Sequence, residues 1–252
     1  YSLEDVFIQS SNIGTSRVAI NAGLEAVTRY YDALGLFHAA DIELPEPAGP
    51  IVYPRDPKNW SQLTLAQSAF GQGMAITPLS YAEAVGAVLN GGCLRPLTIK
   101  KYNGAPLSCN RVFKPQTSQT MLELMRENVL KGTGGRANAP GLRVGGKTGS
   151  AQKPAKGGYD PTNLISSFAA VFPTDGPVDG DRYLVQIMFD SPHGSPMSNG
   201  GRLGGVVAAP VAGRVIDRIA PMLGVARKED KFTTPQWDKA PIQPEDVTGE
   251  DH

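Results

Sequence analysis

The chain has 252 residues, of which 40% are hydrophobic and 19% charged, and its 24 Lys and Arg residues balance 24 Asp and Glu residues. This length suffices for one large domain with a sizeable core or for two small domains. A net charge of zero argues against nucleic acid or an anionic membrane as the main partner. No apolar run approaches the roughly 20 residues that span a bilayer, and no signal-peptide pattern is visible at the N-terminus.

The first half of the chain is predicted to be mainly helical. Alanine, valine and isoleucine recur at helical spacing over residues 1–34, with Gly23 as a break between two segments. Residues 39–67 contain five prolines and should form a long irregular stretch. Thr77-Pro78 should cap and open a helix, because threonine accepts from free backbone N–H groups and proline suits a first turn. A further helix is expected over residues 117–130, ending at Gly132.

Two cysteines, Cys93 and Cys109, lie near a predicted hairpin over residues 94–113 with Asn103-Gly104 at its tip. They lack the spacing of a zinc site. Two separate thiols are the slightly favoured interpretation. The alternative is a disulfide that closes the hairpin, which would need an oxidising compartment.

The second half reads as a sheet followed by a helix. Residues 142–152, 164–172 and 183–190 are predicted strands, rich in strand formers, and should form an antiparallel meander. Residues 206–223 should form a final apolar helix, kinked at Pro210. Residues 226–252 are polar and should be an extended or disordered tail.

One nucleotide-binding pattern must be weighed first. Residues 141–148 fit the phosphate-binding loop G-x-x-x-x-G-K-[ST], which requires a helix directly after it. Here Pro154, Gly157 and Gly158 follow, and they disfavour a helix. The pattern is therefore interpreted as part of a strand.

The same residues carry a second pattern. Lys147-Thr148-Gly149 in a predicted strand, together with Ser10-x-Asn12 near a helix start, matches two motifs of serine acyltransferases. A lysine offers positive charge to a carboxylate, and the hydroxyls of Thr148 and Ser150 offer hydrogen bonds. An asparagine can both donate to and accept from a substrate amide. Gly149 leaves room for a peptide to lie along the strand.

Further segments extend this match over residues 1–225, and together they resemble class B penicillin-binding proteins, especially the division-specific type. The resemblance implies an α/β, β-lactamase/transpeptidase-like fold with an antiparallel sheet flanked by helices, its N-terminal portion with the nucleophile helix being absent. It is carried by SSNIG at 10–14, AFGQGMAITPL at 69–79, LNGG at 89–92, KGTGGRA at 131–137 and GGKTGSAQK at 145–153.

By that resemblance the protein is a serine D,D-transpeptidase that acts on the D-Ala-D-Ala end of peptidoglycan stem peptides and is acylated by β-lactams. Ser10, Asn12 and Lys147 would be catalytic, and Thr148, Gly149 and Ser150 would bind substrate, with the Ser150 N–H as half of the oxyanion hole. The resemblance implies no cofactor or metal. It also implies cell-division partners and a membrane-anchored parent protein at the periplasmic face of the inner membrane.

The family's nucleophile motif, S-x-x-K, should precede Ser10 and is expected to be missing from this chain. The one match, Ser150 to Lys153, is interpreted as a decoy, because residues three apart in a strand point to opposite faces. Tyr159 is expected in a loop after the Lys147-Thr148-Gly149 motif. Two alternatives stay open: a related D,D-carboxypeptidase or β-lactamase, and a non-catalytic domain that binds peptidoglycan or partner proteins.

Overall fold

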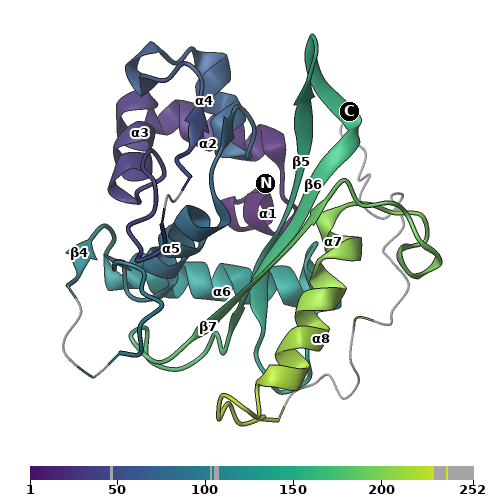
Figure 1. Cartoon of the computed structure of the whole chain (residues 1–252). Helices are drawn as coiled ribbons and strands as arrows, with labels where there is room; N and C mark the ends of the chain where they lie inside the picture. The colour runs from purple at the N-terminus through teal and green to yellow at the C-terminus, as the bar shows by residue number, and fades with distance from the viewer. Residues whose placement is uncertain (46–47, 103, 105–107, 230–236, 238–252) are drawn as a thin grey trace. The chain divides into compact units, whose positions relative to one another are not determined.

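The computed structural model describes residues 1–45, 48–102, 104, 108–229 and 237 (Figure 1). The chain divides into two compact units. The helical unit comprises residues 1–127 and 174–184, and the sheet unit comprises residues 128–173 and 185–252. Of the three borders, one falls inside a helix, one inside a strand and one in the connection after β6, and each unit is built from two separate stretches of chain.

The helical unit consists of short helices and two-residue strand pairs. Its elements are α1 (Leu3–Ile8), α2 (Asn12–Ala22), α3 (Leu24–Ala33), β1 (Ile51–Val52), the 3-10 helix η1 (Pro57–Asn59), α4 (Gln62–Ala69), β2 (Met74–Ala75), α5 (Pro78–Leu89), β3 (Cys93–Leu94), β4 (Asn110–Arg111) and the larger part of α6 (Pro115–Lys131).

Local sequence signals account for most of these helix ends. Gly23, with a φ of 85°, separates α2 from α3 as predicted. The Thr77 side chain accepts from the Ser80 N–H and opens α5, also as predicted. The expected irregular stretch 39–67 is wrong at its end. Ser61 caps α4, which can begin at Gln62 because the prolines stop at Pro57.

The α1–α2 corner is tightly packed. A Cβ atom on Gly14 would lie 2.4 Å from a methyl carbon of Val6, so only glycine lets the two helices approach this closely. Further along α2, the Ser16 hydroxyl donates to the Ala66 carbonyl of α4 at 3.3 Å. These contacts hold α2 between its two neighbouring helices.

The two cysteines are joined in a disulfide with a Cα–Cα distance of 5.1 Å, so the preference for separate thiols is wrong. Pairing of Cys93 with Arg111 and of Leu94 with Asn110 brings the two chain segments together. Asn90 contributes as well, because its side-chain amide bonds both the N–H and the carbonyl of Cys93. The predicted hairpin is thus present at its base, while Asn103 of the predicted tip lies outside the described residues.

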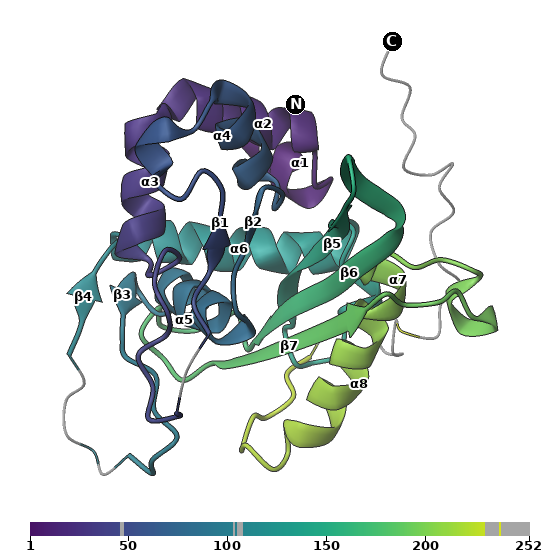
Figure 2. The same ribbon diagram turned by 45° about the horizontal axis from the view of Figure 1, so that its top comes forward.

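The sheet unit is built on a three-stranded sheet in the order β5-β6-β7 (Figure 2). β5 and β6 are antiparallel, and their hairpin reaches past the end of β7. The strands β5 (Gly145–Ala155), β6 (Gly158–Phe172) and β7 (Tyr183–Asp190) confirm the three predicted strands, although β5 and β6 are longer at the turn between them. Phe168 and Phe172 are completely buried and form the centre of this unit's core.

Short helices cover the sheet. The unit contains η2 (Gly135–Ala137), η3 (Pro196–Ser198), α7 (Gly204–Val207) and α8 (Ala209–Ile219). α7 contacts β5 and β6, and α8 contacts β6 and η2. The predicted final helix is broken at Ala208, two residues before the expected kink at Pro210. Pro210 instead occupies the first turn of α8, a position that proline tolerates.

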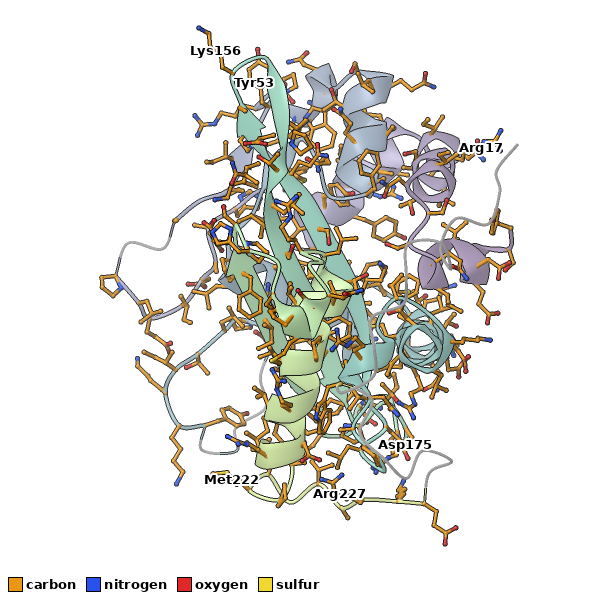
Figure 3. The ribbon with its side chains drawn as sticks, turned by 90° about the vertical axis from the view of Figure 1, so that its right-hand side faces the viewer. Arg17, Tyr53, Lys156, Asp175, Met222 and Arg227 are labelled. Carbon is orange, nitrogen blue, oxygen red and sulfur yellow. A yellow bond between two sulfur atoms is a disulfide. The ribbon has the colours of Figure 1, made fainter. Side chains whose placement is uncertain are left out.

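The chain after α8 returns to the sheet unit. The Lys228 N–H donates to the Gly141 carbonyl at 3.0 Å. Arg227, labelled beyond the end of α8 in Figure 3, forms an ion pair with Asp217 at 2.6 Å. Apart from 226–229 and Trp237, the predicted tail lies outside the described residues. Among the described residues, no helix combines the length and apolar character needed to cross a membrane.

Candidate active site

The Lys147-Thr148-Gly149-Ser150 segment lies in β5, at the edge of the described sheet. Lys147 is opposite Ala169 of β6, and Ser150 is opposite Ser166. β6 is the one strand that pairs with β5 in the described part of the chain. The other edge of β5 can therefore pair with an extended peptide. Because β5 continues to Ala155, the segment is not a phosphate-binding loop, as the sequence indicated.

Lys147 carries a perturbed ammonium group. Burial disfavours the charged form and lowers the pKa of Lys147 to about 8. Its Nζ atom donates to the Thr148 carbonyl at 3.2 Å and lies 3.5 Å from Thr148 Oγ1. At neutral pH the side chain is still mostly protonated, so it can attract a carboxylate, and its proton is easier to release than that of an ordinary lysine.

Ser150 is exposed, and its hydroxyl is held by helix α7. The N–H of Gly204 donates to Ser150 Oγ at 2.9 Å. The serine oxygen thus accepts a hydrogen bond and keeps its own hydrogen as a donor for a ligand. A Cβ atom on Gly204 would lie 2.3 Å from the Ser167 carbonyl oxygen and 2.6 Å from that of Gly149, so a glycine is required for this contact.

Thr148 is supported from a loop whose role the sequence did not predict. Thr133 Oγ1 lies 2.9 Å from Thr148 Oγ1, and the Asn128 side-chain amide donates to Thr133 Oγ1 at 3.2 Å. The sequence predicted only that a helix ends at Gly132. The surrounding glycines suggest a simple turn, although Thr133 between them contacts the Lys147-Thr148-Gly149 motif.

Ser10 and Asn12 lie together at the α1–α2 corner of the helical unit. Ser11 caps α2 by accepting from the Gly14 N–H, and Asn12 is the first helical residue. Ser10 has a φ of 57°, a left-handed conformation that is uncommon for a residue with a side chain. Both Ser10 and Asn12 are exposed. Strained backbone of this kind is often found at functional sites.

The predicted site residues therefore fall into two groups. Ser10 and Asn12 are placed together in the helical unit, and Lys147 to Ser150 are placed together in the sheet unit. Residues within each group are neighbours. That both groups act on one substrate is part of the function proposed below.

The S-x-x-K match at 150–153 lies in a strand. Lys153 forms an ion pair with Asp190, whereas Ser150 bonds Gly204. A nucleophile and its base would have to face each other from one helical turn, whereas these two residues of β5 have partners on different elements, Asp190 of β7 and Gly204 of α7. Their arrangement supports the interpretation of this match as a decoy.

Tyr159 is in a strand, and its predicted loop position is wrong. It pairs with Pro154 of β5, because the hairpin extends to a tight turn at Lys156 and Gly157 (Figure 3). The glycines at 157 and 158, which suggested a loop, have φ values of 91° and 150° that suit the hairpin end instead.

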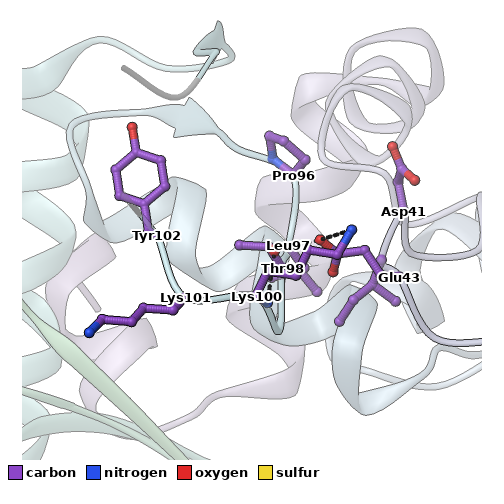
Figure 4. Close-up of a pocket in the computed structure, with 9 residues that line it drawn as sticks. Asp41, Glu43, Pro96, Leu97, Thr98, Lys100, Lys101 and Tyr102 are labelled. Carbon is purple, nitrogen blue, oxygen red and sulfur yellow. Dashed lines mark hydrogen bonds and ion pairs between the residues drawn. The ribbon is translucent and has the colours of Figure 1, made fainter. Parts of the chain in front are cut away.

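A separate pocket of ≈ 470 Å³ lies in the helical unit (Figure 4). It is lined by residues 41–43, 96–98 and 100–102, and none of the predicted site residues is among them. Hydrogen bonds from the Thr98 hydroxyl at 2.6 Å and the Ile99 N–H at 3.1 Å lower the pKa of Glu43. The Glu43 carboxylate in this pocket thus already has protein partners.

Known proteins are similar to this chain over most of its length. Residues 1–217 match the family described as the penicillin binding protein transpeptidase domain, and the chain belongs to this family. It is 49% identical, over 92% of its length, to a probable peptidoglycan D,D-transpeptidase FtsI of Caulobacter vibrioides. It is 31% identical, over 97% of its length, to the stage V sporulation protein D of Bacillus subtilis. The chain spans 40% and 38% of the length of these two relatives.

Solved structures confirm the expected α/β transpeptidase-like fold. The transpeptidase domain of penicillin-binding protein 3 from Burkholderia pseudomallei superposes with a TM-score of 0.79 and 30% identity, covering 90% of this chain and 66% of that one. Penicillin-binding protein 3 of Mycobacterium tuberculosis, solved with ampicillin, gives a TM-score of 0.78 at 28% identity, covering 94% of this chain and 54% of that one.

Proposed function

We propose that this chain is part of a serine D,D-transpeptidase that cross-links peptidoglycan stem peptides through an acyl-enzyme and is a target of β-lactams. The observation that carries the proposal is the edge strand β5. It places the Lys147 ammonium group, the supported hydroxyl of Thr148 and the Ser150 hydroxyl along four successive residues. Membership of the transpeptidase family supports the same assignment.

In the proposed reaction, a serine of an S-x-x-K motif outside this chain gives its proton to the lysine of that motif and attacks the carbonyl between the two D-alanines of a stem peptide. The Ser150 N–H and the N–H of that serine hold the oxyanion. The carbon–nitrogen bond then breaks, and the departing amine of D-alanine takes a proton from the Ser10 hydroxyl, which recovers one from Lys147. An amine of a second stem then attacks the enzyme ester and passes its surplus proton through Ser10 back to Lys147. The serine oxygen leaves with the proton held by the motif lysine, and the new amide bond is the cross-link.

The remaining residues position the substrate. Asn12 bonds the amide of the stem peptide, while the terminal carboxylate lies against Lys147, Thr148 and Ser150. The peptide adds along the free edge of β5. On the other side of the strand, Gly149 is required by its neighbour, because a Cβ atom there would lie 2.6 Å from Ser167 Oγ of β6.

The biological setting is proposed from relatives and from one internal feature. The FtsI name of the 49% identical relative supports an acyltransferase role in cell division with division proteins as partners. We place the parent protein at the periplasmic face of the inner membrane. The Cys93–Cys109 disulfide supports this location, because such bonds persist in oxidising compartments.

The test compares intact masses before and after incubation with benzylpenicillin. We expect the full-length protein to gain one penicillin mass and the 252-residue chain alone to gain none. Lys147→Ala in the full-length protein should slow acylation roughly a hundredfold, since proton transfer and charge stabilisation are both lost. Lys101→Ala, which removes an exposed lysine of the helical unit, is the control and should react normally.

Three results would contradict the proposal. Wild-type acylation of a folded Lys147→Ala variant would remove Lys147 from the mechanism. A full-length protein that gains no mass would favour the non-catalytic binding domain. Rapid turnover of the bound penicillin would instead favour a carboxypeptidase or a β-lactamase, because those enzymes hydrolyse their acyl-enzymes.

A further inference from the structure

A line of three hydrogen-bonded polar side chains ends at Thr148 of the Lys147-Thr148-Gly149 motif. Asn128, which is completely buried in the last turns of α6, donates from its side-chain amide to Thr133 Oγ1 at 3.2 Å. Thr133 Oγ1 lies 2.9 Å from Thr148 Oγ1. All three residues belong to the sheet unit, so this line lies within one compact body.

We propose that Thr133 is a positioning residue that turns the Thr148 hydroxyl into a hydrogen-bond donor for the carboxylate of the substrate, an inference that rests on the proposed transpeptidase function. Thr133 does not itself touch the substrate in this arrangement. It acts through Thr148.

The direction of the hydrogen bonds decides what Thr148 can offer. A hydroxyl has one hydrogen to donate. If Thr148 gave its hydrogen to Thr133, it would present only lone pairs to a carboxylate, which has only lone pairs of its own. If Thr133 instead accepts from Asn128 and donates to Thr148, the Thr148 hydrogen is directed to the ligand.

Close packing keeps Thr133 in place. A Cβ atom on Gly205 of α7 would lie 2.7 Å from the Thr133 carbonyl oxygen, so the helix and the loop already touch. On the next residue, a Cβ atom on Gly134 would lie 2.6 Å from Asn128 Oδ1. The loop cannot move toward either neighbour, and the line of hydrogen bonds is therefore pre-organised.

The experiment compares Thr133→Val, which keeps the shape and loses the hydroxyl, with Thr133→Ser, which keeps the hydroxyl. Acylation of the full-length protein is followed at several concentrations of benzylpenicillin and of its methyl ester. We expect Thr133→Val to weaken the non-covalent affinity for benzylpenicillin about tenfold, the loss of about one hydrogen bond, with little change in the limiting acylation rate. Thr133→Ser should stay within about twofold of wild type.

The methyl ester separates positioning from general damage. Because the ester has no carboxylate, Thr133→Val should change its acylation by less than about threefold. Equal slowing of acid and ester, or a Thr133→Val variant that binds benzylpenicillin as wild type does, would overturn the inference. If Thr133→Val does not fold, Thr133→Ala is measured under the same criteria. If benzylpenicillin does not acylate the full-length wild type, the proposed function itself is refuted.

Discussion

At the scale of single residues, the environment of Lys147 is the most consequential feature. Burial lowers its pKa from 10.5 to about 8, whereas a lysine on an open surface keeps its ordinary value. The folded protein thus tolerates a costly ammonium group in the strand where we propose that a carboxylate binds. Such perturbed groups concentrate at functional sites.

This perturbation predicts a pH effect on stability. Between pH 8 and 10.5 the unfolded chain keeps a proton on Lys147 that the folded chain has released, so unfolding takes up a proton. The free energy of unfolding should therefore rise with pH in this window, relative to Lys147→Met, by at most about 3 kcal/mol. Urea unfolding of both proteins at pH 7, 8, 9 and 10 measures the difference, and parallel curves would contradict the predicted pKa.

At the scale of elements, glycines let α7 and β5 touch. The Gly204 N–H reaches Ser150 Oγ because nothing but hydrogen separates the helix backbone from the carbonyls of Ser167 and Gly149. The position of the Ser150 hydroxyl therefore depends on the start of a helix more than 50 residues further along the chain.

Gly204→Ala should accordingly destabilise the protein. The added methyl group would meet two carbonyl oxygens, and overpacking of this kind costs about 1–3 kcal/mol. Gly86→Ala is the matched control, since Gly86 lies within α5 with no atom within 4 Å of an added Cβ, and it should gain about 1 kcal/mol of helix propensity. Thermal unfolding of both variants should show a lower melting temperature for Gly204→Ala and a higher one for Gly86→Ala. Equal shifts of the two melting temperatures would contradict the packing argument.

The disulfide is the second element-scale feature. It joins residues 16 apart in sequence, and a loop of this size is expected to contribute about 3 kcal/mol by restricting the unfolded chain. Dithiothreitol should therefore lower the melting temperature of the wild type and leave that of Cys93→Ser/Cys109→Ser unchanged. A wild type insensitive to reduction would show that this bond contributes little.

At the scale of the whole molecule, each unit collects segments that are distant in sequence. In the sheet unit, Arg136 of η2 joins three of them. Its guanidinium donates to the carbonyls of Met197 at 3.4 Å, Val206 at 3.3 Å and Trp237 at 2.8 Å. The Trp237 ring packs on α8, where a Cβ atom on Gly213 would lie 2.9 Å from Cε3.

Arg136→Ala should lower the free energy of unfolding by about 2 kcal/mol, because three backbone carbonyls lose a charged donor. Arg136→Lys should restore only part of this, since one ammonium group cannot match the planar fork of a guanidinium. Arg218→Ala, at an exposed position of α8, should have an effect below about 0.5 kcal/mol. Chemical denaturation compares the three variants, and an equal loss in Arg136→Ala and Arg218→Ala would argue against the role of Arg136.

Much of the architecture was predictable because its signals are local. Gly23 ends one helix, Thr77-Pro78 begins another, and the strand formers around residues 183–190 indicate a strand without knowledge of any partner. The start of α4 was missed because a dense run of prolines obscured the Ser61 cap. Tyr159 was misplaced because glycines also occur at hairpin turns.

The sequence by itself determined the family, the fold class and the candidate residues from Ser10 to Ser150, since these depend on residue types in a fixed order. The tertiary structure alone decided that Cys93 pairs with Cys109, that Thr133 supports Thr148 and that Gly204 holds Ser150. These contacts join segments brought together by chain reversals. Their geometry follows from how strands and helices pack, which no local pattern of residues encodes.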